Sequence, residues 1–404
     1  MVLAVISVLL LPMTRIVLWL IILVLRFAQI CTIVCAGFNK YNKKFLSCTV
    51  RFEKKCIKVY LWGRIFSRMA QKNTLLTISE QTGYSVSTIS RVLSGKAKTY
   101  RISRETETLI KEAAQRLNYQ PNLIAQTLRT QKSNTVGLLI PEVDNPFFAS
   151  LAGIIIGILH SRGYHVLLAD SRESARDEVQ ELRMFMSRSV DGIICIPVSS
   201  TPDFHEHVSS QIPMVLIDRH FKKTSLSYVC TDNYAGSRMA TEYLLDKGYK
   251  RILAIQGVPD SMPNKERVRG FVDAIGVHGV DYKIAGNAFS VENGNREILA
   301  AFSGGREYDA VFAFSATILL GAIDALRRLD LRPGKDVGII SYDNNGFLDF
   351  MDPAVTRVEQ PLREAGKVAV DTLMEIIAAR RAGHPDPASR QILIPPTLVV
   401  RGSC

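Results

Sequence analysis

From Thr135 to the C-terminus, short apolar runs alternate with segments of helical periodicity. The runs read TVGLLI, YHVLLA, GIICIP, PMVLI, RILAIQ, DAVFAF and DVGIIS. Continuous apolar runs are typical of strands that are buried on both faces, and strands that alternate with helices form parallel sheets. We therefore predict an α/β body over residues 135–404, built from two parallel sheets with helices on both faces.

This body is predicted to have two lobes. Strands up to about Ile217 form one sheet, strands from about Arg251 form the other, and the segment 228–234 crosses between them. Ligands of open α/β sheets bind at the carboxyl ends of the strands. We therefore expect a ligand in the cleft between the lobes.

Residues 74–95, TLLTISEQTGYSVSTISRVLSG, have helically spaced apolar residues on both sides of a glycine. Gly83 suits a tight turn because it adopts positive φ without a Cβ clash, and Ser85 is a good N-cap for the second helix. This pattern is typical of a helix-turn-helix, whose second helix enters the DNA major groove. Taken alone, the segment also fits an ordinary helical hairpin with a polar face.

The outer face of the second helix carries small hydroxyls, one valine and one guanidinium. Such side chains suit phosphate contacts and a bidentate contact from arginine to guanine. The expected outer residues are Val86, Ser87, Thr88, Ser90 and Arg91.

A third helix is expected after Ser103 and completes an all-α head over residues 69–118. Its apolar stripe consists of Leu109, Ile110, Ala113, Ala114 and Leu117. A hinge and linker follow at 119–134, where a short helix beginning near Pro121 would be marginal alone. We expect this helix to order only against DNA or against the same helix of a second subunit.

The formal charge of +12 is unevenly distributed. Residues 1–68 carry 11 Lys or Arg and one acidic residue. Residues 69–132 carry ten Lys or Arg and four acidic residues, and residues 133–404 carry 29 Lys or Arg and 33 acidic residues. A basic head on a mildly acidic body favours a DNA-binding module joined to a soluble sensor domain.

The first 68 residues form an apolar and basic extension. Residues 1–38 are strongly apolar, and nine Lys or Arg follow between Lys40 and Arg68. Either the extension is a membrane anchor that holds the remainder in the cytoplasm, or it is upstream sequence before a true start at Met69. The second interpretation is favoured because nothing in 1–68 is patterned to pack against the rest. We expect a cytoplasmic, nucleoid-associated protein, anchored to a membrane only if residues 1–68 are translated.

Several motifs resemble the lactose-repressor (LacI/GalR) family of bacterial transcription regulators, in that family's order. They are TISEQTGYSVSTISRVLSG, YQPNLIAQTLRTQKSNTVGLLIPEVDNPFF, DGIICIP, IDR, DNYAG, ERVRGF, SYDN and PPTLVVRGSC. The resemblance covers about residues 69–404, and residues 1–68 have no counterpart. It implies a two-lobed periplasmic-binding-protein-like body and a homodimer on a pseudo-palindromic double-stranded DNA operator.

For the head, the resemblance implies that Val86, Ser87 and Arg91 read bases. Thr88 and Ser90 match positions that contact phosphates.

For the hinge, Leu128 matches a leucine that wedges into a central minor-groove step and kinks the operator. Ala125 matches the other hinge position that faces the minor groove. The alternative for Leu128 is a plain helix-packing leucine.

For the body, the resemblance places polar-ligand contacts in ERVRGF and SYDN. The run DNPFF follows the first predicted strand and would lie at the edge of the cleft. An aromatic wall with a guanidinium and a carboxylate suits a sugar or another small polar ring. Core packing of the phenylalanines and an ion pair between the arginine and Glu266 or a neighbour are the alternatives. The expected effector-binding residues are Asp144, Asn145, Phe147, Phe148, Arg267 and Asp343.

One departure from the family concerns the ligand. After the DAVFAF run the family usually has Asn-Asp, whose carboxylate binds sugar hydroxyls, whereas this chain has Ser315-Ala316. The loss of that acceptor argues against a plain hexose and leaves the effector open. Asn344 also replaces the second acid of the commoner Asp-Asp, although Asp343 is kept.

No Walker loop, GxSxG elbow or HExxH motif is present, so we expect neither an enzyme nor a cofactor. We also expect no metal site, because the seven cysteines form no CxxC pair. His205 and His207 are expected in a solvated loop. A membrane-attached solute-binding protein is the alternative function, but the basic head argues against it. We therefore predict a dimeric DNA-binding transcriptional repressor whose operator affinity is controlled by a small ligand.

Overall fold

The computed structural model describes residues 74–119 and 132–404, apart from residues 277 and 306. The chain divides into two compact units, Met1–Pro121 and Asn122–Cys404. The predicted extension 1–68, most of the predicted linker 119–134, and both hinge residues, Ala125 and Leu128, lie outside the described residues. Within the described ranges, no helix is both long enough and apolar enough to cross a membrane.

The first unit contains the predicted three helices, α3 (Leu75–Thr82), α4 (Val86–Leu93) and α5 (Arg104–Arg116). Gly83 ends α3 in the left-handed conformation at φ 75°, which glycine adopts at little cost. The Ser85 and Ser103 hydroxyls cap α4 and α5 by accepting bonds from backbone N–H groups. The sequence therefore determines both the turn and the helix starts locally.

The three helices enclose a small apolar core. Its buried members are Ile78, Ile89, Val92, Ala97, Ile110, Ala113 and Ala114. Leu109 was expected in this core but is 41% exposed. Residues 110, 113, 114 and 117 already follow the i, i+3, i+4, i+7 spacing of one helix face, and Leu109 lies at the edge of that face.

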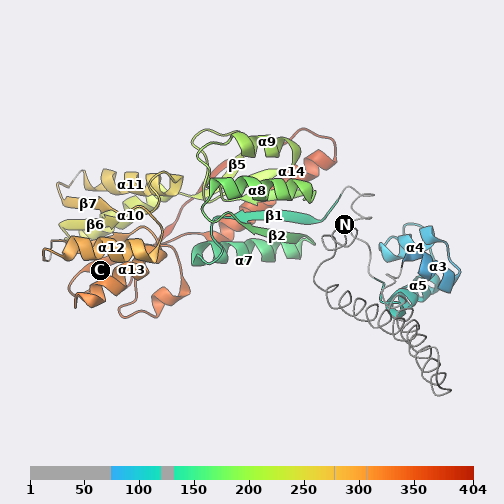
Figure 1. The fold of residues 1–404 in the computed structure, drawn as a ribbon, viewed down its shortest axis with the longest axis horizontal. Coiled ribbons are helices and arrows are strands. Elements are labelled where there is room, and N and C mark those ends of the chain that lie inside the picture. The colour runs from blue at the N-terminus through green and yellow to red at the C-terminus, as the bar shows by residue number, and fades with distance from the viewer. Residues whose placement is uncertain (1–73, 120–131, 277, 306) are drawn as a thin grey trace, which may run out of the picture. The chain divides into compact units, whose positions relative to one another are not determined.

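The second unit begins with a lobe built on a six-stranded parallel sheet in the order β11-β5-β4-β3-β1-β2. Figure 1 shows β1, β2 and β5 of this sheet. α7 (Pro146–Ser161) and α14 (Leu362–Arg381) pack on one face, and α8 (Ala175–Ser187) and α9 (Asp203–Gln211) pack on the other. Strand residues alternate between the two faces, as a pleated strand requires. The strands are β1 (Thr135–Ile140), β2 (His165–Asp170), β3 (Gly192–Cys195), β4 (Met214–Ile217), β5 (Ser227–Thr231) and β11 (Gln391–Ile394).

The other lobe contains a six-stranded sheet in the order β12-β10-β9-β8-β6-β7. Its strands are β6 (Arg251–Ile255), β7 (Asp281–Ala285), β8 (Ala310–Ala313), β9 (Gly338–Tyr342), β10 (Thr356–Glu359) and β12 (Thr397–Val399). The α10–α11 and α12–α13 pairs lie on opposite sides of it (Figure 1). These helices are α10 (Asn233–Asp246), α11 (Met262–Ile275), α12 (Val291–Phe302) and α13 (Ala316–Arg328).

The two predicted sheets are present, but their boundaries differ from the prediction. β5, expected within the crossover, belongs to the first sheet and pairs with β4. Its sequence SYVCT begins and ends with polar residues, so it does not read as an apolar run. The chain crosses between lobes after β5, after β10 and after β11.

One strand is antiparallel, although only parallel strands were predicted. β12 runs opposite to β10. β10 leaves its lobe at its carboxyl end, and the chain returns from β11 at the same edge without a crossover helix, so β12 must run the other way.

The packing of α12 against α13 depends on two glycines. A Cβ at Gly321 would lie 1.8 Å from the carbonyl oxygen of Val291, and a Cβ at Gly294 would lie 2.0 Å from that of Ile318. The backbones of the two helices therefore touch where a side chain would separate them.

We expect Gly321→Ala to lower the free energy of unfolding by about 1–3 kcal/mol, the usual cost of overpacking. Urea unfolding followed by circular dichroism measures the change. Gly157→Ala is the control, because Gly157 lies in α7 with no atom within 4 Å of its added Cβ. Equal stability of the two variants would contradict the close approach of α12 and α13.

Candidate DNA-binding and ligand-binding sites

The five residues expected to contact DNA lie together on α4. Val86, Ser87 and Arg91 are exposed, and Thr88 and Ser90 are partly buried. The N-terminal half of this helix thus presents a polar surface. Backbone N–H groups and the positive end of the dipole at a helix N-terminus favour contacts with phosphate.

Hydroxyl groups at the start of α4 form a small network. The Ser85 Oγ lies 2.8 Å from the hydroxyl oxygens of both Ser87 and Thr88. It also accepts a bond from the Thr88 backbone N–H at 3.2 Å. The capping residue therefore holds the two hydroxyls in place, with Ser87 still exposed for a further contact.

Arg91 contacts an aromatic ring that sequence reasoning missed. Its guanidinium carbon lies 4.1 Å from the ring centroid of Tyr100, which is 48% exposed. Stacking on the ring restricts the guanidinium and leaves its N–H edge available. An aromatic residue in the basic turn KAKTYR was the available signal.

In the second unit, a cavity with about 380 Å³ of empty space lies between the two lobes. Five of the six predicted effector residues line it, whereas Asp144 is exposed and does not. The lining residues that were not predicted come mostly from segments directly after strands. The lining consists of Asn145, Phe147, Phe148, Asp218, Arg219, Pro263, Arg267, Phe289, Ser315, Thr317, Asp343 and Gln360.

Arg267 belongs to this lining and is buried, with 4% of the residue exposed. Its Nε donates to the Asn233 Oδ1 at 2.8 Å, and its Nη1 donates to the Phe314 carbonyl oxygen. Its carbon lies 3.7 Å from the ring centroid of Tyr342. The alternative ion pair with Glu266 is not formed, because Glu266 pairs with Arg269 instead.

Asp343 is held by two donors at the end of β9. The Gln360 Nε2 donates to its Oδ1 at 2.6 Å, and the Ala316 backbone N–H donates to its Oδ2 at 3.2 Å. The Gln360 Oε1 is buried and has no partner among the described groups. A buried acceptor without a partner is costly, so this oxygen is suited to accept a bond from a ligand.

Asp218 and Arg219 follow β4 and were missed, although the motif IDR contains them. Arg219 donates two bonds to the Glu173 carboxylate, at 2.8 and 2.6 Å. Asp218 and Asp343 both have left-handed backbones, at φ 63° and 78°. Strained non-glycine residues of this kind concentrate at functional sites.

Aromatic rings form the apolar part of the lining. The Phe147 and Phe148 rings meet edge to face at 5.3 Å between centroids. The Arg219 guanidinium carbon lies 5.5 Å from the centroid of Phe148, and that of Arg267 lies 5.9 Å from the centroid of Phe289. Phe148 also belongs to the core of the first lobe. It therefore both lines the cavity and packs in the core.

At the departure Ser315-Ala316, the methyl group of Ala316 takes the place of the family's carboxylate. The Ser315 Oγ accepts from the Ile318 N–H as the N-cap of α13. Ser315 and Thr317 line the cavity, whereas Ala316 does not. The carboxylates that remain in the lining are those of Asp218 and Asp343.

The expectation for His205 was wrong. It is fully buried, whereas His207 is exposed as predicted, and both lie on α9 rather than in a loop. His205 and Val208 are three residues apart on one face of α9, and this face packs inward.

Burial raises the pKa of Asp218 to about 6, although the charges of Arg219 and Arg267 oppose the shift. An unfolded aspartate titrates near pH ~3.9. The folded protein therefore holds this proton more tightly. Its contribution to the free energy of unfolding is complete below about pH 4 and is lost as the pH rises through about 6.

We expect Asp218→Asn to remove this pH dependence, which should amount to about 1–3 kcal/mol between pH ~4 and ~7. Urea unfolding of both proteins across this range gives the difference in stability. Asp273→Asn, an exposed substitution on α11, should follow the wild type. Parallel pH profiles for wild type and Asp218→Asn would refute the raised pKa.

Residues 74–122 match the bacterial regulatory proteins of the lacI family, and residues 241–404 match the periplasmic binding protein-like domain. The chain is 31% identical over 304 residues to the ribose operon repressor of Halalkalibacterium halodurans, which covers 75% of this chain and 90% of the relative.

Two solved structures extend the likeness. The lac repressor dimer bound to operator and the anti-inducer ONPF superposes with a TM-score of 0.73, at 21% identity, over 82% of this chain and 99% of that one. A periplasmic binding protein/LacI transcriptional regulator from Alkaliphilus metalliredigens, in complex with D-xylulofuranose, gives a TM-score of 0.57 at 25% identity. That match covers 67% of this chain and 98% of the other. The chain therefore belongs to the lacI family of bacterial regulatory proteins.

Proposed function

We propose that this protein is a transcriptional repressor that binds operator DNA through α4 and a small sugar in the cleft. The exposed polar face of α4 supports the first part and the lining of the cavity supports the second. In this proposal Val86, Ser87 and Arg91 read bases, while Thr88 and Ser90 contact phosphates. The sugar changes the affinity for DNA, which is a coupling between two separate sites.

The ligand class follows from the chemistry of the lining. Sugars offer apolar ring faces to Phe147 and Phe148, and hydroxyls to the carboxylates and guanidinium groups around them. Within this class we propose a pentose. The relative that is named a ribose operon repressor and the neighbour that holds D-xylulofuranose support this choice.

The proposal includes a dimer of this chain on the operator DNA. Two copies of the chain would place two heads on the half-sites of a pseudo-palindromic operator, with Ala125 and Leu128 of the hinge at the minor groove between them. Such a protein acts in the cytoplasm on the nucleoid and has no catalytic role. The family of the head argues against a membrane-attached solute-binding protein.

The cavity is tested by thermal unfolding of the full chain with pentoses, hexoses, sugar acids and purines. We expect a pentose to raise the melting temperature, since a ligand at ~100 times its Kd adds ~2.7 kcal/mol of stability. Asp343→Asn should abolish the response, and Asp144→Asn, outside the cavity, should keep it. A panel without any sugar response, or a response that survives in Asp343→Asn, would contradict the proposed site.

The head is tested by Arg91→Ala in a selection from random DNA. We expect a loss of about 1–3 kcal/mol in binding and a relaxed preference at one base position of each half-site. Arg116→Ala, at the end of α5, serves as the control and should leave the selected sequence unchanged. If Arg91→Ala weakened specific and random DNA equally, the proposed base contact would be wrong.

A further inference from the structure

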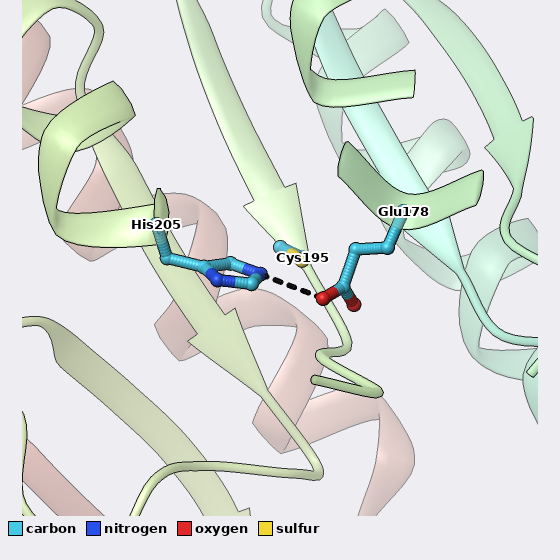
Figure 2. A group of neighbouring side chains, drawn as sticks. All are labelled: Glu178, Cys195 and His205. Carbon is cyan, nitrogen blue, oxygen red and sulfur yellow. Dashed lines mark ion pairs between the residues drawn. The ribbon is translucent and has the colours of Figure 1, made fainter. Parts of the chain in front are cut away.

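Three buried side chains with metal-ligating atoms meet inside the first lobe. Figure 2 shows Glu178 from α8, Cys195 at the end of β3 and His205 from α9 directed toward one another. Each is 0% exposed, and one ligand atom of each lies within 4.8 Å of the other two. None of the three lines the cleft cavity, so the proposed sugar site does not account for this cluster.

The imidazole of His205 is not satisfied by hydrogen bonds. Neither ring nitrogen has a hydrogen-bond partner among the described groups, although the Nε2 lies 3.2 Å from the Glu178 Oε1. A buried polar nitrogen without a partner is costly. Two ligands of a tetrahedral cation, each bound at ~2.0–2.1 Å, are themselves ~3.3 Å apart. The observed separation therefore suits two atoms that share a metal ion.

Backbone N–H groups and one hydroxyl fix the Glu178 carboxylate. Its Oε2 accepts from the Val198 N–H at 2.6 Å, and its Oε1 accepts from the Ser199 N–H at 3.1 Å and from the Ser199 hydroxyl. Hydrogen bonds of this kind orient ligating carboxylates in metal sites. The carboxylate is therefore held in place.

Cys195 completes a donor set of sulfur, nitrogen and oxygen. A divalent cation deprotonates a coordinating thiol outright, so this sulfur would bind as a thiolate. Cys230 is also buried in this lobe but belongs to no such group among the residues that the structure describes.

We infer that Glu178, Cys195 and His205 bind a borderline divalent transition-metal ion, with Zn²⁺ as the best match. Cysteine, histidine and glutamate are the protein ligands that Zn²⁺ takes. The ion would join α8, β3 and α9 and would hold the 196–199 segment through Glu178. It acts as a structural ion of the first lobe, and the rival reading is a buried His205–Glu178 ion pair without metal.

Co²⁺ titration of the full chain tests the inference, because a Co²⁺–thiolate bond gives a charge-transfer band that an ion pair cannot produce. All proteins compared in this experiment carry four cysteine-to-serine substitutions, so that the N-terminal extension supplies no thiolate. These are Cys31→Ser, Cys35→Ser, Cys48→Ser and Cys56→Ser. We expect one equivalent of Co²⁺ with the band, and its displacement by Zn²⁺. Cys195→Ser should remove the band and weaken Zn²⁺ binding by more than the ~10–100-fold that the loss of an outer-shell partner costs, while Cys230→Ser should retain both.

X-ray absorption of the Zn²⁺-loaded protein gives a result that needs no substitution at the site. We expect one sulfur ligand at ~2.3 Å, with nitrogen and oxygen ligands at ~2.0–2.2 Å. This readout applies even if Cys195→Ser fails to fold. The inference is overturned if the protein binds neither ion, if the Co²⁺ band persists in Cys195→Ser, or if Zn²⁺ has no sulfur ligand.

Discussion

The buried guanidinium of Arg267 is the interaction on which the ligand-binding side of the second lobe depends. A buried charge is tolerated only when surrounding groups replace the water that it loses. Here the replacements come from three elements, namely the Asn233 amide at the start of α10, the Phe314 carbonyl after β8 and the Tyr342 ring at the end of β9. Because the three elements all contact the Arg267 side chain, this side chain holds the carboxyl ends of their strands around the cavity.

The charged groups that line the cavity also contact the segments that connect the two lobes. Gln360 lies where the chain crosses after β10, and Asn233 lies just beyond the crossing after β5. One contacts Asp343 and the other contacts Arg267, so a ligand that bonds to either charged group also acts on a crossing segment. A two-state change in the lobes needs a ligand with different affinities for the two states. In the crossing segments, such a difference in affinity would change the positions of the two lobes.

The sequence allowed most of the architecture to be predicted, because helix caps, Gly83 and apolar strands are local signals. It failed at β5 and β12, whose places depend on where the chain returns between lobes, and at Leu109, which lies at the edge of an apolar stripe. In the cavity, Asp218, Ser315 and Gln360 were not predicted, although each directly follows a strand and the rule that ligands bind after parallel strands could have found them. Phe289 and the buried His205 carry no such signal, because only tertiary packing brings them to their neighbours.

Control of transcription by a sugar requires a coupling between the cleft and the DNA-binding head, and this coupling can be measured directly. The affinity of the full chain for the region upstream of its own gene is followed by fluorescence anisotropy, with and without the sugar that raises the melting temperature. We expect a shift in Kd of about 5- to 150-fold at saturating sugar, with an equal reciprocal effect of DNA on sugar affinity. An unchanged Kd at saturation would mean that the cleft does not control the head.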